Sequence, residues 1–485
     1  MLLGLDLGTG SAKALLIEAS GTVRGEGAAS YPVRSPRPGW AETDPRDWWE
    51  ACAEAVRTAV GGRGASVAAL GLSGQMHGVV LSDAAGNPRR PAVLWADTRS
   101  AGMLARYREL DAGLLRGLAN PLAAGMAGPN LLWLRDEEPG VYRAARWALQ
   151  PKDWLRLRLT GEAFSEPSDA SATLLYDLEA DNWSGPVIEA LGLRGDLFPP
   201  LKSSEAPAGT LAREAAVSLG LPAGLPVAAG AGDTAAALLG SGLLEPGPVQ
   251  LTVGTGAQIF SPRESPVADL RLRTHLYRAA HDHPSGRYYS LAAIQNAGLA
   301  LEWVLNALGA SWEEAYREAF SVPAGAEGVT FLPYLSGERT PHFDSAARGA
   351  WVGLGLAHGR AHLLRAAFEG VAFALREGLE ALEEAGVQAP EIRLAGGGVL
   401  DARWRSLLAE VIGRPLGLLR SSVAPNASAR GAALLAGLAC GAYDSVEETL
   451  LIAPEVRETV LPREDDRYEV AYARYRELYP RLRGL

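Results

Sequence analysis

Residues 2–18 read LLGLDLGTGSAKALLIE, and residues 249–260 read VQLTVGTGAQIF. In both stretches an apolar run is followed by Gly-Thr-Gly and then by a second apolar run, a pattern that predicts strand, tight turn and strand. Two hairpins of one design, far apart in the sequence, indicate a duplicated architecture. We therefore expect two similar lobes that face each other across a cleft.

The sequence between and after these hairpins alternates between strand-like and helix-like segments. Strands are predicted at Val67–Leu72, Leu225–Ala229 and Ile392–Leu394, and helices at Thr234–Leu239, Leu299–Leu308, His362–Glu384 and Asp401–Ile412. This alternation predicts an α/β fold. The Gly- and Pro-containing stretch Ser241–Pro248 is the expected boundary, which gives lobes at residues 1–243 and 244–485.

Composition narrows the class of protein. A chain of 485 residues with 48% hydrophobic residues can hold more than one domain. Its net charge of −10 repels phosphate backbones, so nucleic acid is not an expected partner. We find no stretch of about 20 apolar residues and no basic leader, so neither a membrane span nor a signal peptide is expected. These features predict a soluble, cytoplasmic protein; its oligomeric state stays open, a homodimer included.

The first hairpin combines Asp6 with the turn Gly8-Thr9-Gly10. A turn without bulky side chains lets backbone N–H groups and a Thr hydroxyl approach phosphate oxygens. A carboxylate beside the turn can hold Mg²⁺ through water, and Lys13, one of only three lysines, adds positive charge. An ordinary surface turn is the alternative, but the repeat at Gly254-Thr255-Gly256 favours phosphate binding, with one loop at each end of a nucleotide's phosphate chain.

Asp233 lies where an apolar strand meets a helix, among Gly and Ala residues that leave room for a ligand. Ligands of α/β folds bind at the carboxyl ends of strands, and a carboxylate there can take a proton from a substrate hydroxyl. Asp233 is also a candidate residue for the metal site. The alternative is a helix cap, which is a frequent role of Asp at this position.

Two further strand ends carry candidate ligand groups. Gln75-Met76-His77-Gly78 offers a Gln and a His that can hydrogen-bond sugar hydroxyls, with Met as an apolar wall; a loop histidine without a ligand is the alternative. Gly396-Gly397-Gly398 precedes a predicted helix and suits close approach of the backbone to a flat ring or a phosphate, although three glycines also suit a plain loop.

Five segments, in this order, resemble the FGGY family of carbohydrate kinases, which belongs to the actin-like ATPase superfamily. The resemblance extends over nearly the whole chain, and its segments are Asp6–Lys13 (DLGTGSAK), Leu72–Gly78 (LSGQMHG), Pro151–Glu162 (PKDWLRLRLTGE), Gly232–Ala235 (GDTA) and Phe331–His342 (FLPYLSGERTPH). It implies two actin-like, ribonuclease H-like lobes with an interlobe cleft, ATP as the phosphoryl donor and Mg²⁺. The last segment is similar to the form found in family members that phosphorylate D-xylulose.

The resemblance also implies roles for individual residues. Asp233 matches the general base, and Asp6 matches the acid near the metal and the transferred phosphate. The sugar side is assigned to Gln75, Met76, His77, Asp233 and Thr234. The nucleotide side is assigned to Gly8, Thr9, Lys13, Gly254, Thr255, Gly298, Gly396, Gly397 and Asp401.

The sequence departs from the family pattern at the sugar side. Thr234 stands where an Asn is usual, and Ala96 in Trp95-Ala96-Asp97 stands where an Asn is usual. A kinase for another ketose or a polyol, such as ribulose, therefore stays an alternative to a D-xylulose kinase. An actin-like nucleotide switch without a sugar substrate is a more distant alternative, which Asp233 and the Met76-His77 pair disfavour.

Overall fold

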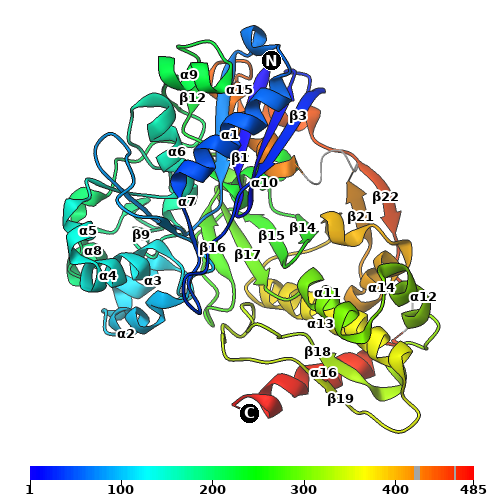
Figure 1. The fold of residues 1–485 in the computed structure, drawn as a ribbon. Helices are drawn as coiled ribbons and strands as arrows, with labels where there is room; N and C mark the ends of the chain where they lie inside the picture. The colour runs from blue at the N-terminus through cyan, green and yellow to red at the C-terminus, as the bar shows by residue number, and fades with distance from the viewer. Residues whose placement is uncertain (420–425, 464–465, 485) are drawn as a thin grey trace.

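The two Gly-Thr-Gly segments each form a hairpin at the centre of a mixed β-sheet. The computed structural model describes residues 1–419, 426–463 and 466–484. β1 (Leu2–Leu7) pairs antiparallel with β2 (Ser11–Ile17), and β14 (Pro248–Val253) pairs antiparallel with β15 (Ala257–Arg263). Both predicted hairpins are confirmed, and each lies in its own lobe (Figure 1).

The two sheets share one plan. Their strand orders are β11-β12-β5-β1-β2-β3, with β13 beside β5, and β16-β17-β15-β14-β20-β21-β22. In each, a third antiparallel strand extends the hairpin on one side and two parallel strands follow on the other. The first sheet also contains β3 (Val23–Ser30), β5 (Ala69–Gly74), β11 (Pro207–Thr210), β12 (Pro226–Ala228) and β13 (Ala231–Gly232). The second also contains β16 (His275–Arg278), β17 (Tyr288–Ile294), β20 (Glu391–Ala395), β21 (Leu416–Leu419) and β22 (Val456–Val460). This duplication confirms the predicted α/β, two-lobed, actin-like fold.

Helices cover both sheets because the apolar faces of a sheet must be buried against another layer of structure. In the first lobe α1 (Pro45–Val60) packs on β2 and β3; Asp44 caps its start, Gly61 ends it in the left-handed conformation, and Trp48 is buried. In the second lobe the long α13 (Arg360–Glu384) packs against β17 and against β18 (Thr330–Leu332).

The other helices are α2 (Leu104–Arg108), α3 (Ala112–Leu118), α4 (Ala127–Glu137), α5 (Pro139–Ala144), α6 (Pro151–Thr160), α7 (Pro167–Ala170), α8 (Gly185–Ala190), α9 (Arg213–Leu219), α10 (Asp233–Gly240), α11 (Gly298–Leu308), α12 (Trp312–Ala319), α14 (Ala402–Ile412), α15 (Ala427–Ala439) and α16 (Glu469–Leu482). Short strands pair outside the main sheets: β4 (Glu42–Thr43), β6 (Val80–Ser82), β7 (Ala92–Val93), β8 (Trp147–Leu149), β9 (Tyr176–Asp177), β10 (Asn182–Trp183), β18 (Thr330–Leu332) and β19 (Ala350–Val352).

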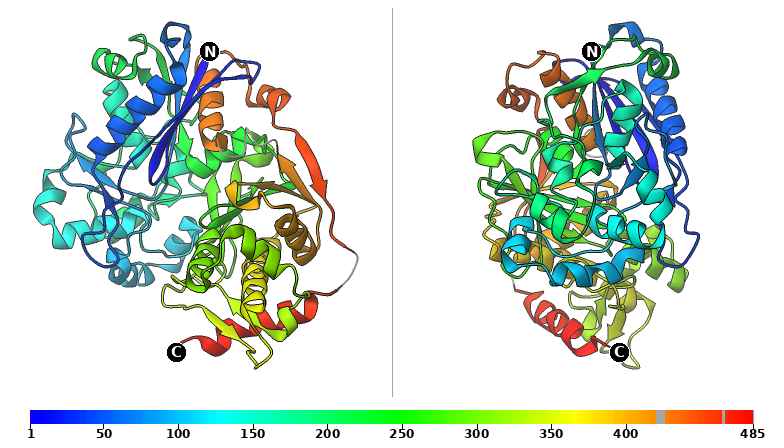
Figure 2. Two further views of the ribbon diagram at one scale, coloured as in Figure 1. Left: turned by 45° about the vertical axis from the view of Figure 1, so that its right-hand side comes forward. Right: turned by 90° about the vertical axis from the view of Figure 1, so that its left-hand side faces the viewer.

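The helix α15 comes late in the chain but packs on the first sheet. It lies against β1 and β5 and beside α10. In Figure 2 it is the orange helix next to the blue strands. Gly4 of β1 and Gly71 of β5 permit this approach, because a Cβ at either position would lie 1.8 Å from a carbonyl oxygen of the helix, that of Ala429 or Ala432. The division of the chain at residue 243 stays a prediction, and the first lobe is completed by a helix from beyond it.

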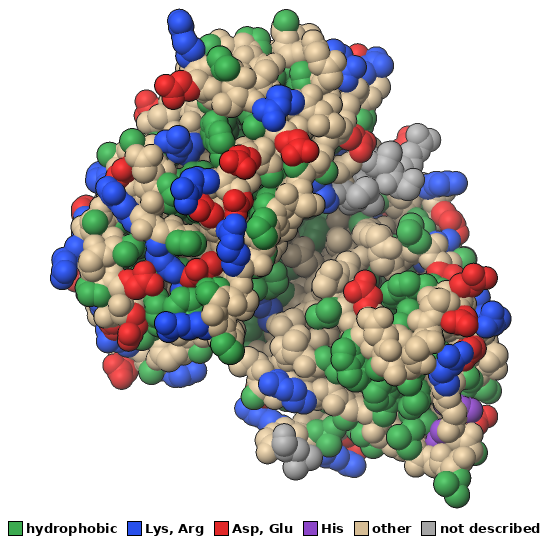
Figure 3. All heavy atoms as spheres, viewed as in Figure 1, with side chains coloured by type: hydrophobic (Ala, Val, Ile, Leu, Met, Phe, Trp, Pro, Cys, Tyr) green, Lys and Arg blue, Asp and Glu red, His purple; other side chains and the backbone are tan. Residues whose placement is uncertain are grey.

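The two lobes are joined through a shared apolar core and separated by a cleft. Leu238, Phe260 and Leu435, from α10, β15 and α15, are buried in one cluster. Between the two lobes the surface is hollowed, as the space-filling view shows near its centre (Figure 3). Within the described part of the chain, no helix is both long and apolar enough to cross a membrane.

Candidate active site

Strand register brings the two predicted acids to one edge of the first sheet. β1, β5 and β13 are neighbouring parallel strands, with Asp6 opposite Ser73 and Ser73 opposite Ala231. Asp233 follows two residues after Ala231, as the first residue of α10. Three carboxyl ends of parallel strands thus place Asp6, Ser73 and Asp233 together, where α/β folds bind ligands.

The electrostatics of this edge set the protonation of both acids. The Asp6 carboxylate accepts a hydrogen bond from Ser73 Oγ at 2.8 Å. Burial raises the pKa of Asp6, and the Ser73 hydrogen bond and the charge of Lys13 oppose the rise. Removal from water raises the pKa of Asp233 to about 7, and the charge of Asp6 adds to this rise. A carboxylate with a pKa near neutrality suits proton transfer.

Thr234 restrains the Asp233 carboxylate. Its backbone N–H and its Oγ1 both donate to Asp233 Oδ1, at 2.6 and 3.1 Å. These two bonds lower the pKa of Asp233, against the larger effect of burial. The second carboxylate oxygen, Oδ2, accepts neither of them, so the carboxylate keeps an oxygen for another donor.

The turn after β1 is held by the surrounding protein. Gln75 Nε2 donates to the carbonyl of Gly8 at 3.1 Å, and Trp95 Nε1 donates to Thr9 Oγ1 at 2.8 Å. The hydroxyl of Tyr31 also donates to the Gly8 carbonyl. The turn is therefore fixed by the protein itself, and the Thr9 hydroxyl still has its proton to donate.

The second-lobe turn meets two other predicted nucleotide-side elements. Gly298 N donates to the carbonyl of Gly254 at 3.0 Å, and a Cβ on Gly298 would lie 2.5 Å from that oxygen. β20 runs parallel to β14, so Gly396 follows at the same sheet edge; its φ is +99° and a Cβ would lie 2.2 Å from Val253 O. Gly397 is exposed with open space at its Cβ position. Gly254, Thr255, Gly298, Gly396 and Gly397 thus gather at one edge of the second sheet.

Asp401 has a structural partner of its own. It caps α14 by accepting from Arg403 N at 2.8 Å, and its Oδ2 pairs with Arg403 Nη2 at 2.7 Å. The Arg403 guanidinium lowers the pKa of Asp401. The predicted helix start at Asp401 therefore moves to Ala402, because the Asp side chain occupies the cap position.

Of the predicted sugar-side residues, Met76 and His77 are both buried, and Met76 lies next to the residue before Asp233. Met76 contacts the position where a Gly232 side chain would be, and its Sδ lies 3.7 Å from Tyr289 Oη. His77 has a φ of +72°, and its Nδ1 lies 2.7 Å from the carbonyl of Ala172. Since a carbonyl can only accept, Nδ1 donates and Nε2 is left as an acceptor. Burial and the charge of Arg339 lower the pKa of His77 to about 4, so the ring is neutral at pH 7.

Gln75 differs from the other predicted sugar-side residues. Its Nε2 is engaged with the Gly8 carbonyl, and its Oε1 is buried without a hydrogen-bond partner in the described residues. The side chain thus connects the turn after β1 with the segment that follows β5.

A cluster of buried charged side chains lies beneath the site, and no role was predicted for it from the sequence. Lys152 is fully buried, and its Nζ contacts carboxylates of Asp153 at 2.6 Å, Glu166 at 3.2 Å and Asp169 at 3.3 Å. Lys152 lies in the quoted segment PKDWLRLRLTGE and is one of three lysines in an Arg-rich chain. That scarcity is the signal that could have marked it.

The ion cluster is connected to both sides of the site. Ser168 Oγ donates to Glu166 Oε1 at 2.9 Å and accepts from Gly232 N at 3.0 Å, directly before Asp233. Gln150 Nε2 donates to the carbonyl of Asp169, and Gln150 Oε1 accepts from His77 N at 2.8 Å. The cluster therefore fixes the backbone at both Asp233 and His77.

Comparison with protein families identifies this arrangement. The model of the FGGY family of carbohydrate kinases, N-terminal domain, matches residues 1–240, and that of the C-terminal domain matches residues 249–440. The chain belongs to the FGGY family of carbohydrate kinases. The family resemblance of the sequence is thereby confirmed.

Similar FGGY proteins cover the full chain. A xylulose kinase of Escherichia coli (strain K12) is 36% identical over 99% of this chain and 98% of its own length. A xylulose kinase of Bacillus subtilis (strain 168) is 32% identical over 100% of this chain and 97% of its own length. A solved structure described as a xyloylose kinase from Brucella ovis has a TM-score of 0.89 and 35% identity, with 99% of both chains covered.

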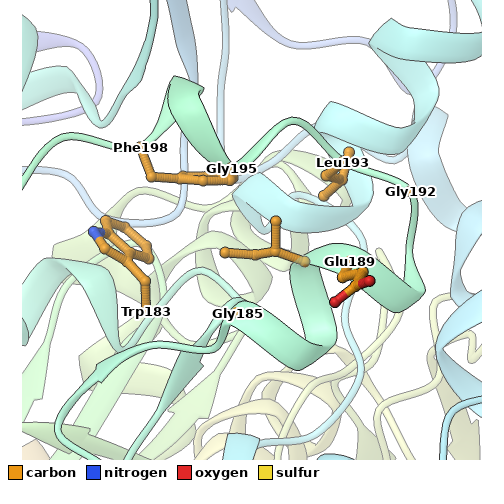
Figure 4. Close-up of a pocket in the computed structure, with 8 residues that line it drawn as sticks. Trp183, Gly185, Glu189, Gly192, Leu193, Gly195 and Phe198 are labelled. Carbon is orange, nitrogen blue, oxygen red and sulfur yellow. The ribbon is translucent and has the colours of Figure 1, made fainter.

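A separate pocket of this FGGY kinase lies away from these residues. It is formed around α8, where Trp183, Leu193 and Phe198 face the hollow (Figure 4). None of the sequence-predicted site residues lines it. We therefore place the candidate active site at the paired strand edges and not in this pocket.

Proposed function

We propose that this FGGY carbohydrate kinase transfers the γ-phosphoryl group of ATP to D-xylulose and yields D-xylulose 5-phosphate. The observation that carries the proposal is Asp233: a carboxylate with a pKa of about 7, at one sheet edge with Asp6 and next to Met76, which packs against Gly232. The full-length relatives described as xylulose kinases support the choice of sugar.

In the proposed reaction Asp233 takes the proton of the terminal sugar hydroxyl. The freed oxygen forms a bond to the γ-phosphorus, and the bond between that phosphorus and the bridging oxygen of ATP breaks, so ADP leaves. Catalysis of this kind rests on positioning and on stabilisation of charge more than on covalent chemistry. The hydrogen bonds from Thr234 to Oδ1 leave Oδ2 as the oxygen that receives the proton.

The residues at the two sheet edges fit Mg-ATP. Mg²⁺ takes one or two carboxylates together with phosphate oxygens and waters, and Asp6, through water, and Asp233 are the carboxylates at this edge. When bound, the ion neutralises charge on the phosphates. Thr9 and Lys13 would contact phosphate from the first lobe. Gly254, Thr255, Gly298, Gly396 and Gly397 would approach the nucleotide from the second lobe, with Asp401 ordering the helix start behind them.

The sugar would lie between Met76 and His77. Met76 offers an apolar wall, and the neutral His77 offers Nε2 as an acceptor for a sugar hydroxyl. The Thr234 hydroxyl donates to Asp233 at 3.1 Å, so it does not extend toward the sugar as an Asn amide would. A bridging water can take that place at a modest cost in affinity, and for this reason we retain D-xylulose over another ketose or a polyol.

The test is a coupled assay of ADP release with D-xylulose, D-ribulose, L-ribulose, glycerol and common pentitols. We expect the highest kcat/KM for D-xylulose and no ADP release without sugar above a low background. Thr234→Asn should leave the ranking unchanged. A tenfold or greater advantage of another substrate would overturn the assignment of the sugar, and sugar-independent ATP turnover would favour the nucleotide-switch alternative.

A further inference from the structure

Three second-lobe residues lie close to the buried ring of His77. His275 and Tyr277 lie on β16, and Arg339 lies in the loop that follows β18. The rings of His275 and Tyr277 stack with their centroids 5.3 Å apart, and the His77 ring lies 6.4 Å from His275 and 5.9 Å from Tyr277. The cluster thus joins a first-lobe residue of the proposed sugar site to the second lobe.

Two buried polar atoms of this cluster lack a partner. His275 Nε2 and the Tyr277 hydroxyl are buried, and neither makes a hydrogen bond to a described residue. His275 Nδ1 lies 3.3 Å from Asn120 Oδ1, an acceptor, so Nδ1 holds the ring proton and Nε2 is a bare acceptor. Burial and the charge of Arg339 keep the pKa of His275 well below its ordinary value. Since unpaired buried polar atoms are costly, both atoms indicate a missing polar ligand.

Arg339 also has hydrogen-bonding capacity that the protein does not use. Its guanidinium stacks over the Trp95 ring, 5.1 Å from the centroid, and Trp95 in turn holds Thr9. In the described residues its guanidinium makes neither a hydrogen bond nor an ion pair. The adjacent Glu338 carboxylate accepts from the backbone of Gln295 and of Arg339 instead, at 2.6 and 2.8 Å.

The charge of Arg339 acts on the histidine side of the site. It lowers the pKa of His77 and of His275, whereas the acid that raises the pKa of Asp233 is Asp6. The guanidinium therefore acts on the rings that form this cluster. Its five N–H donors suit adjacent oxygens of a polyhydroxylated molecule, and the neighbouring aromatic faces suit the C–H faces of a sugar.

We propose that Arg339, His275 and Tyr277 form the second-lobe wall of the sugar pocket, in which Arg339 donates to oxygens of the sugar. This inference rests on the proposed function for the class of ligand. It also means that the sugar contacts both lobes, so sugar binding favours the closed cleft. The competing explanation is that the contact between Arg339 and Trp95 only holds the two lobes together, as a latch, and that Arg339 never touches the sugar. This explanation predicts different kinetics.

The first experiment compares Arg339→Gln and Arg339→Lys with the control Arg476→Gln, which removes an exposed cation that lies 6.0 Å from the Tyr472 ring in the same lobe. KM is measured for sugar and for ATP, and sugar binding without nucleotide is measured by calorimetry. Loss of a charge-assisted hydrogen bond should raise the KM and Kd for sugar by about tenfold or more in Arg339→Gln. The Lys variant should lie between Gln and wild type, and the KM for ATP should match wild type throughout.

Tyr277→Phe supplies a second, independent measurement. Because the Tyr277 hydroxyl has no protein partner in the described chain, its removal should not lower Tm, yet it should raise the KM for sugar. A sugar KM equal to wild type in both Arg339→Gln and Tyr277→Phe would refute the inference. Equal increases in the KM for sugar and for ATP would identify a latch and refute it as well.

The same variants separate this inference from the proposed function. If the wild-type enzyme prefers another sugar to D-xylulose, the sugar assignment fails, and the variants are measured with the preferred sugar. If the wild type turns over D-xylulose and the variants bind it unchanged, only the second-lobe wall fails.

Discussion

Replacement of Asp233 by Asn should make the protein more stable and nearly inactive. Asn keeps an Oδ1 that accepts from Thr234 N and Oγ1, so the local geometry can persist. It cannot accept a proton from a sugar hydroxyl, and loss of a general base costs about 10²–10⁴-fold in turnover. The same substitution removes a carboxylate that is costly to ionise in its surroundings.

The size of the stability gain follows from the pKa of Asp233. Its value is about 7 in the folded protein and 3.8 in the absence of structure. Because the folded state holds this proton more tightly, the contribution of Asp233 to stability is full below pH 3.8 and is lost as the pH rises to 7. The loss amounts to about 4 kcal/mol above pH 7 and to about 1.5 kcal/mol at pH 5. For a chain of this length, 4 kcal/mol corresponds to roughly 4 °C in Tm.

The assay is thermal unfolding of wild type and Asp233→Asn at pH 5 and pH 8, alongside steady-state kinetics. We expect the Tm gain of the variant to be clearly larger at pH 8, and kcat/KM of the wild type to fall as the pH drops below about 7. Asp401→Asn is the control, since Arg403 lowers the pKa of that residue and its loss should reduce Tm. An equal Tm difference at both pH values, or a variant with more than about a tenth of wild-type turnover, would refute the reasoning.

Three other substitutions test the surroundings of the site. Lys152→Met should leave buried carboxylates unpaired and cost about 3–5 kcal/mol, seen as a large fall in Tm that Lys202→Met does not produce. Gly71→Ala should lower Tm or yield insoluble protein, because its Cβ would overlap a backbone carbonyl of α15, whereas Gly140→Ala, with open space around its Cβ position, should be neutral in the same melt. Asp6→Ala should keep the fold by circular dichroism and lose most turnover at saturating Mg-ATP; near-normal turnover would remove Asp6 from the proposed mechanism.

Much of the fold could be predicted because its signals are local. The strand-turn-strand pattern needs only apolar runs and Gly-Thr-Gly, and both copies occur as predicted. The meeting of Asp6 and Asp233 also follows from a general rule, since both end parallel strands of one sheet. Register, and not proximity in sequence, brings them together across more than two hundred residues.

Other parts of the site carry no local signal. The residues around Lys152 are those of an ordinary helix, and only the scarcity of lysine in the whole chain marks a residue that the fold buries among three carboxylates. Arg339 lies in the segment that pointed to the family, but its contact with Trp95 joins distant parts of the chain. The Ala-rich α15 could cover either sheet as judged by its composition, and only the glycines of β1 and β5 specify the one that it covers.

The placement of α15 has a consequence for how the protein is made on the ribosome. Synthesis runs from the N-terminus, so β1 and β5 leave the exit tunnel long before the helix that covers them. Leu2, Leu15 and Ile17, which share a buried cluster with α15, face water or a chaperone until the chain is nearly finished. The first lobe therefore cannot mature as an independent unit during translation, and a nascent chain that stops before residue 427 presents an uncovered sheet that is prone to aggregation.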